Sequence, residues 1–120
     1  MAWSVEHTDE FAEWYRSLSE SQQEDITAAG LLLMEQGPQL PFPYSSGVNG
    51  SRHKHMRELR AQSGGRPIRV FCAFDPRRTA ILPIGGDKTG DDRFYERAIP
   101  VADALYDAYI NETRKEGLIP

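Results

Sequence analysis

The 120-residue sequence has a single cysteine, Cys72, and no long apolar run. One cysteine cannot form a disulfide within the chain, so nothing points to an oxidising compartment. No stretch approaches the roughly 20 apolar residues of a membrane-spanning helix, and the acidic first residues have no apolar signal core. We therefore expect one domain over residues 1–120, located in the cytoplasm, with no membrane partner.

Positive charge is scarce over most of the chain. The protein has 14 Lys/Arg and 18 Asp/Glu residues, which give a net charge of −4. Residues 1–49 hold one cation, Arg16, against eight acids, whereas residues 52–97 hold eleven cations against six acids. Because salt screens charges over roughly 8–10 Å, a local positive field attracts phosphates even on an acidic protein. The distribution indicates a nucleic-acid partner for the middle of the chain.

The sequence also lacks a complete metal site and a nucleotide-binding loop. His53 and His55 have the spacing of two ligands, but no cysteine, third histidine or nearby carboxylate completes the set. Residues 85–90, GGDKTG, lack the P-loop spacing and follow no βαβ pattern. We expect neither a metal nor another cofactor.

Apolar periodicity predicts an α+β fold. A strand over residues 3–7 precedes a helix capped by Thr8, and Ser19 or Ser21 caps a second helix that ends at Gly37. After a loop over residues 37–51, the pattern predicts strands over residues 53–60, 67–74 and 79–84 and a final helix capped by Asp91. The order β-α-α-β-β-β-α places two N-terminal helices on a small antiparallel-rich sheet.

Two prolines interrupt these elements. Pro83 cannot donate a ladder bond, so it indicates an edge, a bulge or an early end of the third of these strands. Pro100 should kink the final helix or begin a second helical piece.

Strand parity assigns the faces of the second of these strands, because alternate residues point to opposite sides. The apolar set expected under the helices is Ile68, Val70, Cys72 and Phe74. Arg69 and Phe71 would then face away, on an uncovered side. A cation beside an exposed ring suits a stacked base and its phosphate, although a solvated Arg on an open sheet fits the same pattern.

Residues 52–60, RHKHMRELR, concentrate cations and proton-transfer groups. Histidine titrates near pH 6.5 and can act as a general acid or base. The alternative is a charged edge strand that resists aggregation. Tyr95, near the start of the final helix, either reaches the open face of the sheet or packs.

Three motifs together resemble a known family. They are residues 50–60 (GSRHKHMRELR), 66–78 (RPIRVFCAFDPRR) and 84–88 (IGGDK), and the match continues through Phe94-Tyr95 and residues 99–106. This pattern is similar to HigB-type toxins of the RelE/ParE superfamily of type II toxin–antitoxin systems, which includes phage-derived members.

The resemblance implies a RelE-like microbial RNase fold and a metal-independent endoribonuclease that cuts mRNA on the ribosome. In such enzymes the RNA 2′-hydroxyl attacks the neighbouring phosphate. It also implies a HigA-like helix-turn-helix antitoxin in a hetero-oligomeric complex. Two alternatives remain: a ParE-like DNA gyrase inhibitor that acts by binding protein, and a non-toxic phage-derived binding module.

The family's site residues transfer by position. The resemblance implies that Arg69 neutralises the phosphate, with Lys88 and Tyr95 beside it, and that the general acid or base is among His55, Lys54 and Glu58. The RNA-binding side chains implied are Arg52, His53, Arg57, Arg60, Phe71, Arg77 and Arg78. Pro83 and the net acidity depart from the family's usual pattern.

Overall fold

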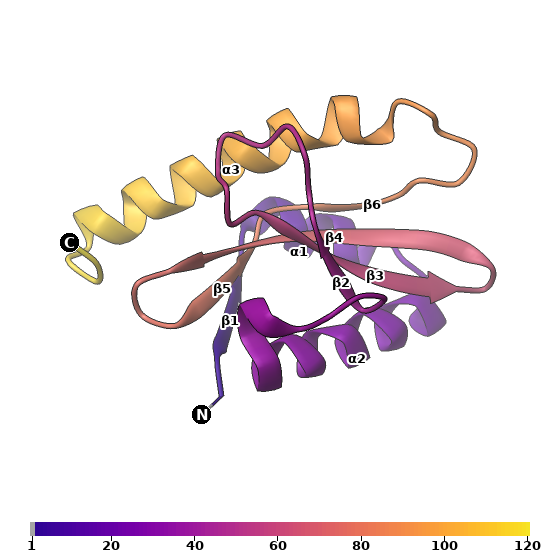
Figure 1. The fold of residues 1–120 in the computed structure, drawn as a ribbon, viewed down its shortest axis with the longest axis horizontal. Helices are drawn as coiled ribbons and strands as arrows, with labels where there is room; N and C mark the ends of the chain where they lie inside the picture. The colour runs from indigo at the N-terminus through magenta and orange to yellow at the C-terminus, as the bar shows by residue number, and fades with distance from the viewer. Residues whose placement is uncertain (1) are drawn as a thin grey trace.

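The computed structural model describes residues 2–120, and Figure 1 shows the arrangement of their helices and strands. The elements, in chain order, are β1 (Ser4–His7), α1 (Asp9–Arg16), α2 (Glu20–Gln36), the 3-10 helix η1 (Gly37–Gln39), β2 (Ser45–Gly47), β3 (Arg57–Ser63), β4 (Arg66–Asp75), β5 (Thr79–Leu82), β6 (Gly85–Asp87) and α3 (Phe94–Lys115). The predicted α+β class and the two N-terminal helices are confirmed. The predicted loop over residues 37–51 contains η1 and the additional short strand β2.

The strands form one sheet in the order β1-β5-β4-β3-β2, and β6 also pairs with β4. Only the β1–β5 pair is parallel among the pairings of residues 2–120. Along the same side of β4, β5 pairs with residues 73–75 and β6 with residues 68–70. Pro83 lies between β5 and β6, so its predicted interruption of the strand is confirmed. Its carbonyl accepts a hydrogen bond from the Thr8 hydroxyl at 2.7 Å.

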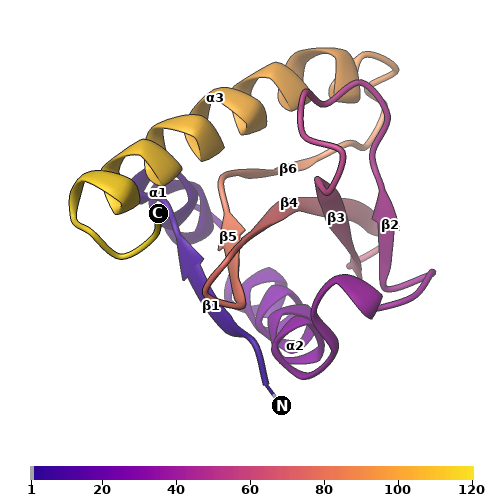
Figure 2. The same ribbon diagram turned by 60° about the vertical axis from the view of Figure 1, so that its left-hand side comes forward.

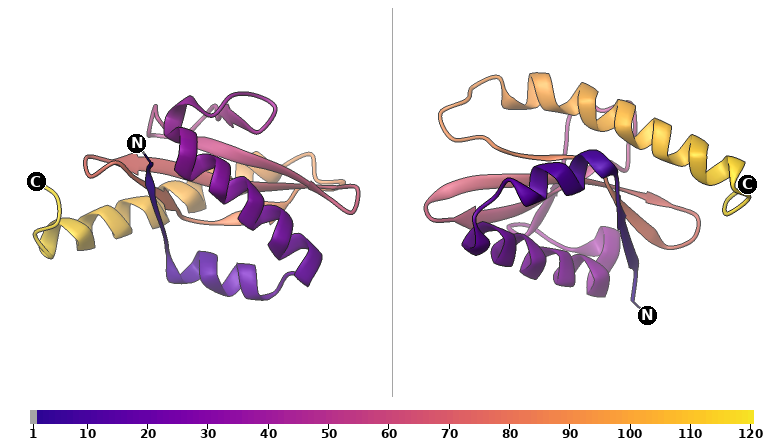
Figure 3. Two further views of the ribbon diagram at one scale, coloured as in Figure 1. Left: turned by 90° about the horizontal axis from the view of Figure 1, so that it is seen from below. Right: turned by 180° about the vertical axis from the view of Figure 1, so that it is seen from behind.

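Local caps explain where the N-terminal helices begin and end. The Thr8 hydroxyl accepts from Phe11 N at 2.9 Å, as predicted. Ser19, rather than Ser21, caps α2 in a reciprocal capping box with Gln22. Gly37 ends α2 at φ 59°, where a Cβ would lie 2.3 Å from Trp3 Nε1, so the close approach requires glycine. Figure 3 shows α1 and α2 following one another against the sheet.

The C-terminal helix differs from the prediction at its start. α3 begins at Phe94 with Arg93 in the N-cap position and no side-chain cap, so the prediction of Asp91 as the cap is wrong. Asp91 instead accepts from Arg93 N at 3.1 Å and forms an ion pair with Arg97. Pro100 lies within one continuous helix. No helix in residues 2–120 is long and apolar enough to cross a membrane.

The sheet is covered on both faces, which corrects the prediction of an open one (Figure 2). On one face Ile68, Val70 and Cys72 pack with apolar residues of α1 and α2, as parity predicts. On the other face Phe71 and Ala73 pack beneath α3 in a second cluster with Phe94, Ile99, Ala102 and Tyr106. The parity assignment is therefore right, but Phe71 is fully buried and offers no stacking surface.

Candidate functional site

Glu58 is a buried carboxylate on the α3-facing side of the sheet. It lies on β3 opposite Ser46 of β2 and Phe71 of β4, and is 3% exposed. Tyr95 donates its hydroxyl proton to Glu58 Oε1 at 2.7 Å, while Ser46 Oγ and Arg60 Nη1 donate to Oε2 at 2.9 and 3.1 Å. These donors compensate the cost of burying the carboxylate.

Arg69 lies beside this carboxylate and is also buried. It is 4% exposed, so the prediction that it stands on an uncovered face is wrong. Its Nη1 donates to Ile68 O at 3.1 Å, and its Nε lies 3.9 Å from Glu58 Oε1. This Nε is buried and has no hydrogen-bond partner among residues 2–120. The guanidinium therefore lies beside Glu58 as an incompletely satisfied charge.

Tyr95 and Lys88 form the more accessible side of the site. Burial and the hydrogen bond to Glu58 raise the pKa of Tyr95, so the phenol is protonated at neutral pH. Lys88 Nζ lies 5.6 Å from the centroid of the Tyr95 ring, within cation–π range. A cavity of about 290 Å³ opens onto Tyr95 and Glu58, lined also by residues 47–49. Of the alternatives for Tyr95, the structure shows that it reaches the carboxylate.

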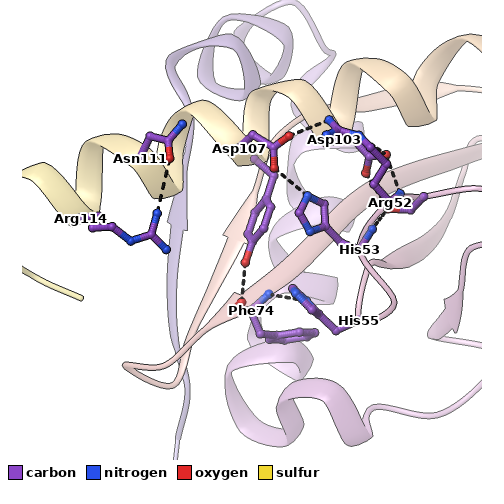
Figure 4. A network of polar contacts seen from close by, with 10 residues as sticks. Arg52, His53, His55, Phe74, Asp103, Asp107, Asn111 and Arg114 are labelled. Carbon is purple, nitrogen blue, oxygen red and sulfur yellow. Dashed lines mark hydrogen bonds and ion pairs between the residues drawn. The ribbon is translucent and has the colours of Figure 1, made fainter. Parts of the chain in front are cut away.

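The predicted histidines lie in a different place. The prediction of a strand is wrong for residues 53–56, which form part of the connection before β3. Figure 4 shows His53 turned toward α3, where its Nε2 lies 2.7 Å from Asp107 Oδ1, and His55 beside Phe74. His55 Nδ1 accepts from Phe74 N at 3.3 Å, and both imidazoles pack edge-on against Tyr106.

Position along α3 separates the histidines from Glu58. Tyr106 contacts the histidines and Tyr95 contacts Glu58, and these tyrosines are eleven residues apart on one helix, about 16 Å at 1.5 Å per residue. Burial, and to a lesser degree His53, lower the pKa of His55, which is therefore neutral at pH 7. Lys54 is exposed in the same connection. The candidate proton-transfer groups thus fall into two separate places.

Other predicted RNA-binding cations are engaged within the protein. Arg52 pairs with Asp107 at 2.6 Å, and Arg57 donates to Ser45 Oγ and Leu40 O. Arg77 pairs with Asp75 and Glu6, and Arg78 lies 4.6 Å from the Trp3 ring centroid. Of the predicted RNA-binding cations, the structure places Arg60 beside Glu58. We call the group formed by Glu58, Tyr95, Ser46, Arg60, Arg69 and Lys88 the Glu58 cluster.

The prediction missed Ser46, which donates to Glu58. The sequence carries no signal for this role, because residues 45–47 lie in a Gly/Pro-rich stretch that reads as loop, and pairing with β3 makes them a strand.

Two further features bear on chemistry. No group of three or more His, Cys, Asp or Glu side chains in residues 2–120 is arranged to hold a metal ion. Cys72 is fully buried, and burial raises the pKa of its thiol to about 12, which makes it a poor nucleophile.

A separate cavity of about 450 Å³ lies by α1 and α2 and is lined mainly by apolar side chains such as Phe11, Ile26 and Leu31. It shares no residue with the Glu58 cluster.

Comparison with solved structures defines the class of fold. A double mutant of the E. coli toxin RelE in the free state superposes with a TM-score of 0.59 at 11% identity, covering 82% of this chain and 96% of RelE. The archaeal RelE–RelB complex from Pyrococcus horikoshii OT3 gives a TM-score of 0.55 at 14% identity, covering 75% and 99%. The protein therefore has a RelE-like fold, which confirms the predicted architecture.

Sequence comparison then gives the family. Residues 13–107 match the family described as "Phage derived protein Gp49-like (DUF891)". The putative toxin HigB3 of Mycobacterium tuberculosis is 43% identical over 91 residues, 75% of this chain and 78% of HigB3. The putative toxin HigB2 of the same organism is 37% identical over 108 residues, 88% of this chain, which spans about half (53%) of HigB2. The chain belongs to this Gp49-like, HigB-related family, and the resemblance seen in the sequence is confirmed.

Proposed function

We propose that this protein is the toxin of a type II toxin–antitoxin pair and that it cleaves mRNA without a metal. Its relatives named as toxins support the first part. The observation that carries the second is the 2.7 Å hydrogen bond from Tyr95 to the buried Glu58, flanked by Lys88, Arg60 and Arg69. An ionisable pair inside a cationic cluster is what phosphodiester cleavage by an internal nucleophile needs.

The proposed proton path runs through Tyr95. The RNA 2′-hydroxyl gives its proton to the Tyr95 hydroxyl oxygen while Tyr95 passes its own proton to Glu58 Oε1. The 2′-oxygen then forms a bond to phosphorus and the bond from phosphorus to the 5′-oxygen breaks. Lys88 gives a proton to the departing 5′-oxygen, leaving a 2′,3′-cyclic phosphate and a 5′-hydroxyl. The raised pKa of Tyr95 favours such a relay over a free phenolate.

The cations have separate tasks in this scheme. Lys88 is partly exposed and contacts the reacting phosphate, and Arg60, also partly exposed, contacts the next phosphate along the RNA. The buried Arg69 acts from beside Glu58. Charge held in a water-poor site stabilises the extra negative charge of the pentacoordinate phosphate, an effect worth roughly 3–4 kcal/mol for a single well-placed donor in other enzymes. Arg69 is thus assigned a positioning and electrostatic role instead of direct contact.

The natural substrate and partner follow from the same proposal. We assign mRNA on the ribosome as the substrate and a HigA-like helix-turn-helix protein as the antitoxin. The concentration of cations in residues 52–97 supports an RNA-facing surface, and the archaeal neighbour was solved in complex with RelB. The eight acidic side chains of residues 1–49, which all lie between Glu6 and Glu35, would face away from the RNA.

The test is induction in bacteria with mapping of mRNA 5′ ends. Tyr95→Phe removes the relay hydroxyl and should lower cleavage about 100-fold or more, as expected for a lost general acid–base group. The matched control is Tyr109→Phe, because Tyr109 also donates to a glutamate, Glu6, at 2.6 Å from the same helix. The control should cleave like the wild type.

Further variants distinguish the alternatives. Lys88→Ala should also abolish cleavage, whereas His55→Ala should not if Glu58 and Tyr95 carry the proton. A different result would place the catalytic site in the connection over residues 52–56. In that case stably folded Tyr95→Phe would keep full cleavage, and His55→Ala or Lys54→Ala would lose it. Growth arrest with intact mRNA and DNA-damage signalling would establish gyrase inhibition instead.

A further inference from the structure

Two exposed aromatic side chains lie shortly before Ser46, whose hydroxyl donates to Glu58. Phe42 and Tyr44 are 69% and 52% exposed, in the segment between η1 and β2. The other large apolar side chains exposed to a similar degree in residues 2–120 are aliphatic and lie in α2, α3 and the C-terminal segment: Leu31, Met34, Val101 and Leu118. Ring exposure is therefore concentrated at one edge of the sheet.

Backbone hydrogen bonds place Tyr44 beside the strand that carries Glu58. Ser46 of β2 is the register partner of Glu58, and Tyr44 O accepts from Arg60 N at 2.9 Å, which continues the pairing beyond β2. Residues two apart along a strand share a face. Ser46 thus stands on the side that carries Arg60 and Glu58, and Tyr44 lies just before β2 beside the backbone of Arg60, at the outer edge of the sheet.

Arg60 connects the rings to the candidate site. Its guanidinium lies 5.0 Å from the centroid of the Phe42 ring, and its Nη1 donates to Glu58 Oε2 at 3.1 Å. A ring with a cation beside it offers both partners that a nucleotide requires, a flat apolar surface for the base and a positive charge for the phosphate.

We propose that Phe42 and Tyr44 form a stacking platform for unpaired bases of single-stranded RNA, with Arg60 on the adjoining phosphate. This inference rests on the proposed cleavage of RNA and adds a binding site to it. The platform holds nucleotides next to the one whose phosphate meets Tyr95 and Lys88. Because a ring stacks only on an exposed base face, duplex RNA is excluded from the platform.

The test measures binding apart from cleavage. The full-length protein is titrated into a fluorescent, unstructured 2′-O-methyl RNA of about ten nucleotides, which has no 2′-hydroxyl to attack. Phe42→Leu and Tyr44→Leu should each weaken binding about tenfold, the size of one lost base stack, and the double variant about 100-fold. Phe42→Tyr and Tyr44→Phe keep a ring and should bind like the wild type.

Matched controls separate stacking from general surface effects. Leu31→Ala removes an equally exposed apolar side chain on α2 and should leave binding unchanged. Tyr109→Phe, which alters a tyrosine of α3 bonded to Glu6, should also bind like the wild type. Both substituted rings are on the surface, so urea midpoints of the leucine variants should match that of the wild type.

Each outcome decides the inference. No binding by the wild type, or equal binding by the double leucine variant, overturns the platform. So does a double variant that keeps RNA binding but no longer copurifies with the antitoxin, because the rings would then be a protein contact. If the double leucine variant cleaves mRNA at the same sites and with the same efficiency as the wild type, the platform is overturned and the proposed function is kept. Ring-dependent binding with no cleavage by the wild type overturns the proposed function and keeps the platform.

Discussion

Removing either partner of the buried Glu58–Arg69 pair should destabilise the protein, but by unequal amounts. Both side chains are 4% exposed, and Arg69 Nε lies 3.9 Å from Glu58 Oε1. Glu58→Gln removes the carboxylate that faces two guanidinium groups. Arg69→Met removes one guanidinium and leaves Glu58 with its other donors, Tyr95, Ser46 and Arg60.

The magnitudes follow from what each variant leaves unpaired. In Glu58→Gln the buried Arg69 has no opposite charge beside it, and uncompensated buried charges cost about 3–5 kcal/mol. In Arg69→Met the unsatisfied Nε disappears as well, which offsets part of the lost attraction, so we expect a net loss of about 1 kcal/mol. The double variant should be more stable than the sum of the single losses predicts, with a coupling of about 1–3 kcal/mol.

Urea unfolding followed by tryptophan fluorescence measures these free energies of unfolding. Trp3 contacts Phe74 and Trp14 contacts Phe11 in the folded protein, so both report on its unfolding. Equal m-values across the set are required for the comparison. The reasoning is refuted if Arg69→Met is the more destabilising variant, or if the two losses simply add.

Three further predictions concern other parts of the protein. Burial lowers the pKa of His55 below its usual 6.5, so the unfolded chain takes up the proton at a higher pH than the folded protein does. The contribution of neutral His55 to stability is therefore complete above about pH 7 and is lost as the pH falls through 6.5. His55→Gln should flatten that part of a profile of melting temperature against pH. Phe71→Ala should cost about 3–5 kcal/mol in urea unfolding because the ring is fully buried, and a loss below about 1 kcal/mol would contradict its packing under α3. Asp103→Ala removes the acceptor for Ser51 Oγ at 2.5 Å and Arg52 N at 2.9 Å, so amide exchange in residues 51–56 should quicken, and unchanged exchange would disprove this anchoring.

The strand containing Arg69 illustrates both the reach and the limit of the sequence pattern. Alternation correctly separated Arg69 and Phe71 from Ile68 and Val70, because strand geometry is a local property. It did not reveal that α3 covers the second face. Phe71 and Ala73, two apolar residues on the supposedly open face, were the available signal that this face is also buried.

The histidines illustrate a different limit. The alternating charges of residues 53–60 resemble a strand, yet β3 begins only at Arg57. The preceding residues are held by α3, through Asp103 and Asp107, about fifty residues further along the chain. Such distant partners are invisible to local periodicity, which is why His55 and Glu58, three residues apart, were grouped in one candidate site.

The sequence by itself determined the class of fold, the helix cap at Thr8, the break at Pro83 and the family. These features depend on local backbone preferences and on motifs that lie within a few residues of one another. Only the tertiary structure decided which candidate residues meet. The Glu58–Tyr95 contact joins β3 to α3, and the placing of Phe42 beside Arg60 depends on β2 pairing at the sheet edge. A buried carboxylate acquires its partners from every layer packed around it, so its surroundings are fixed only when those layers come together.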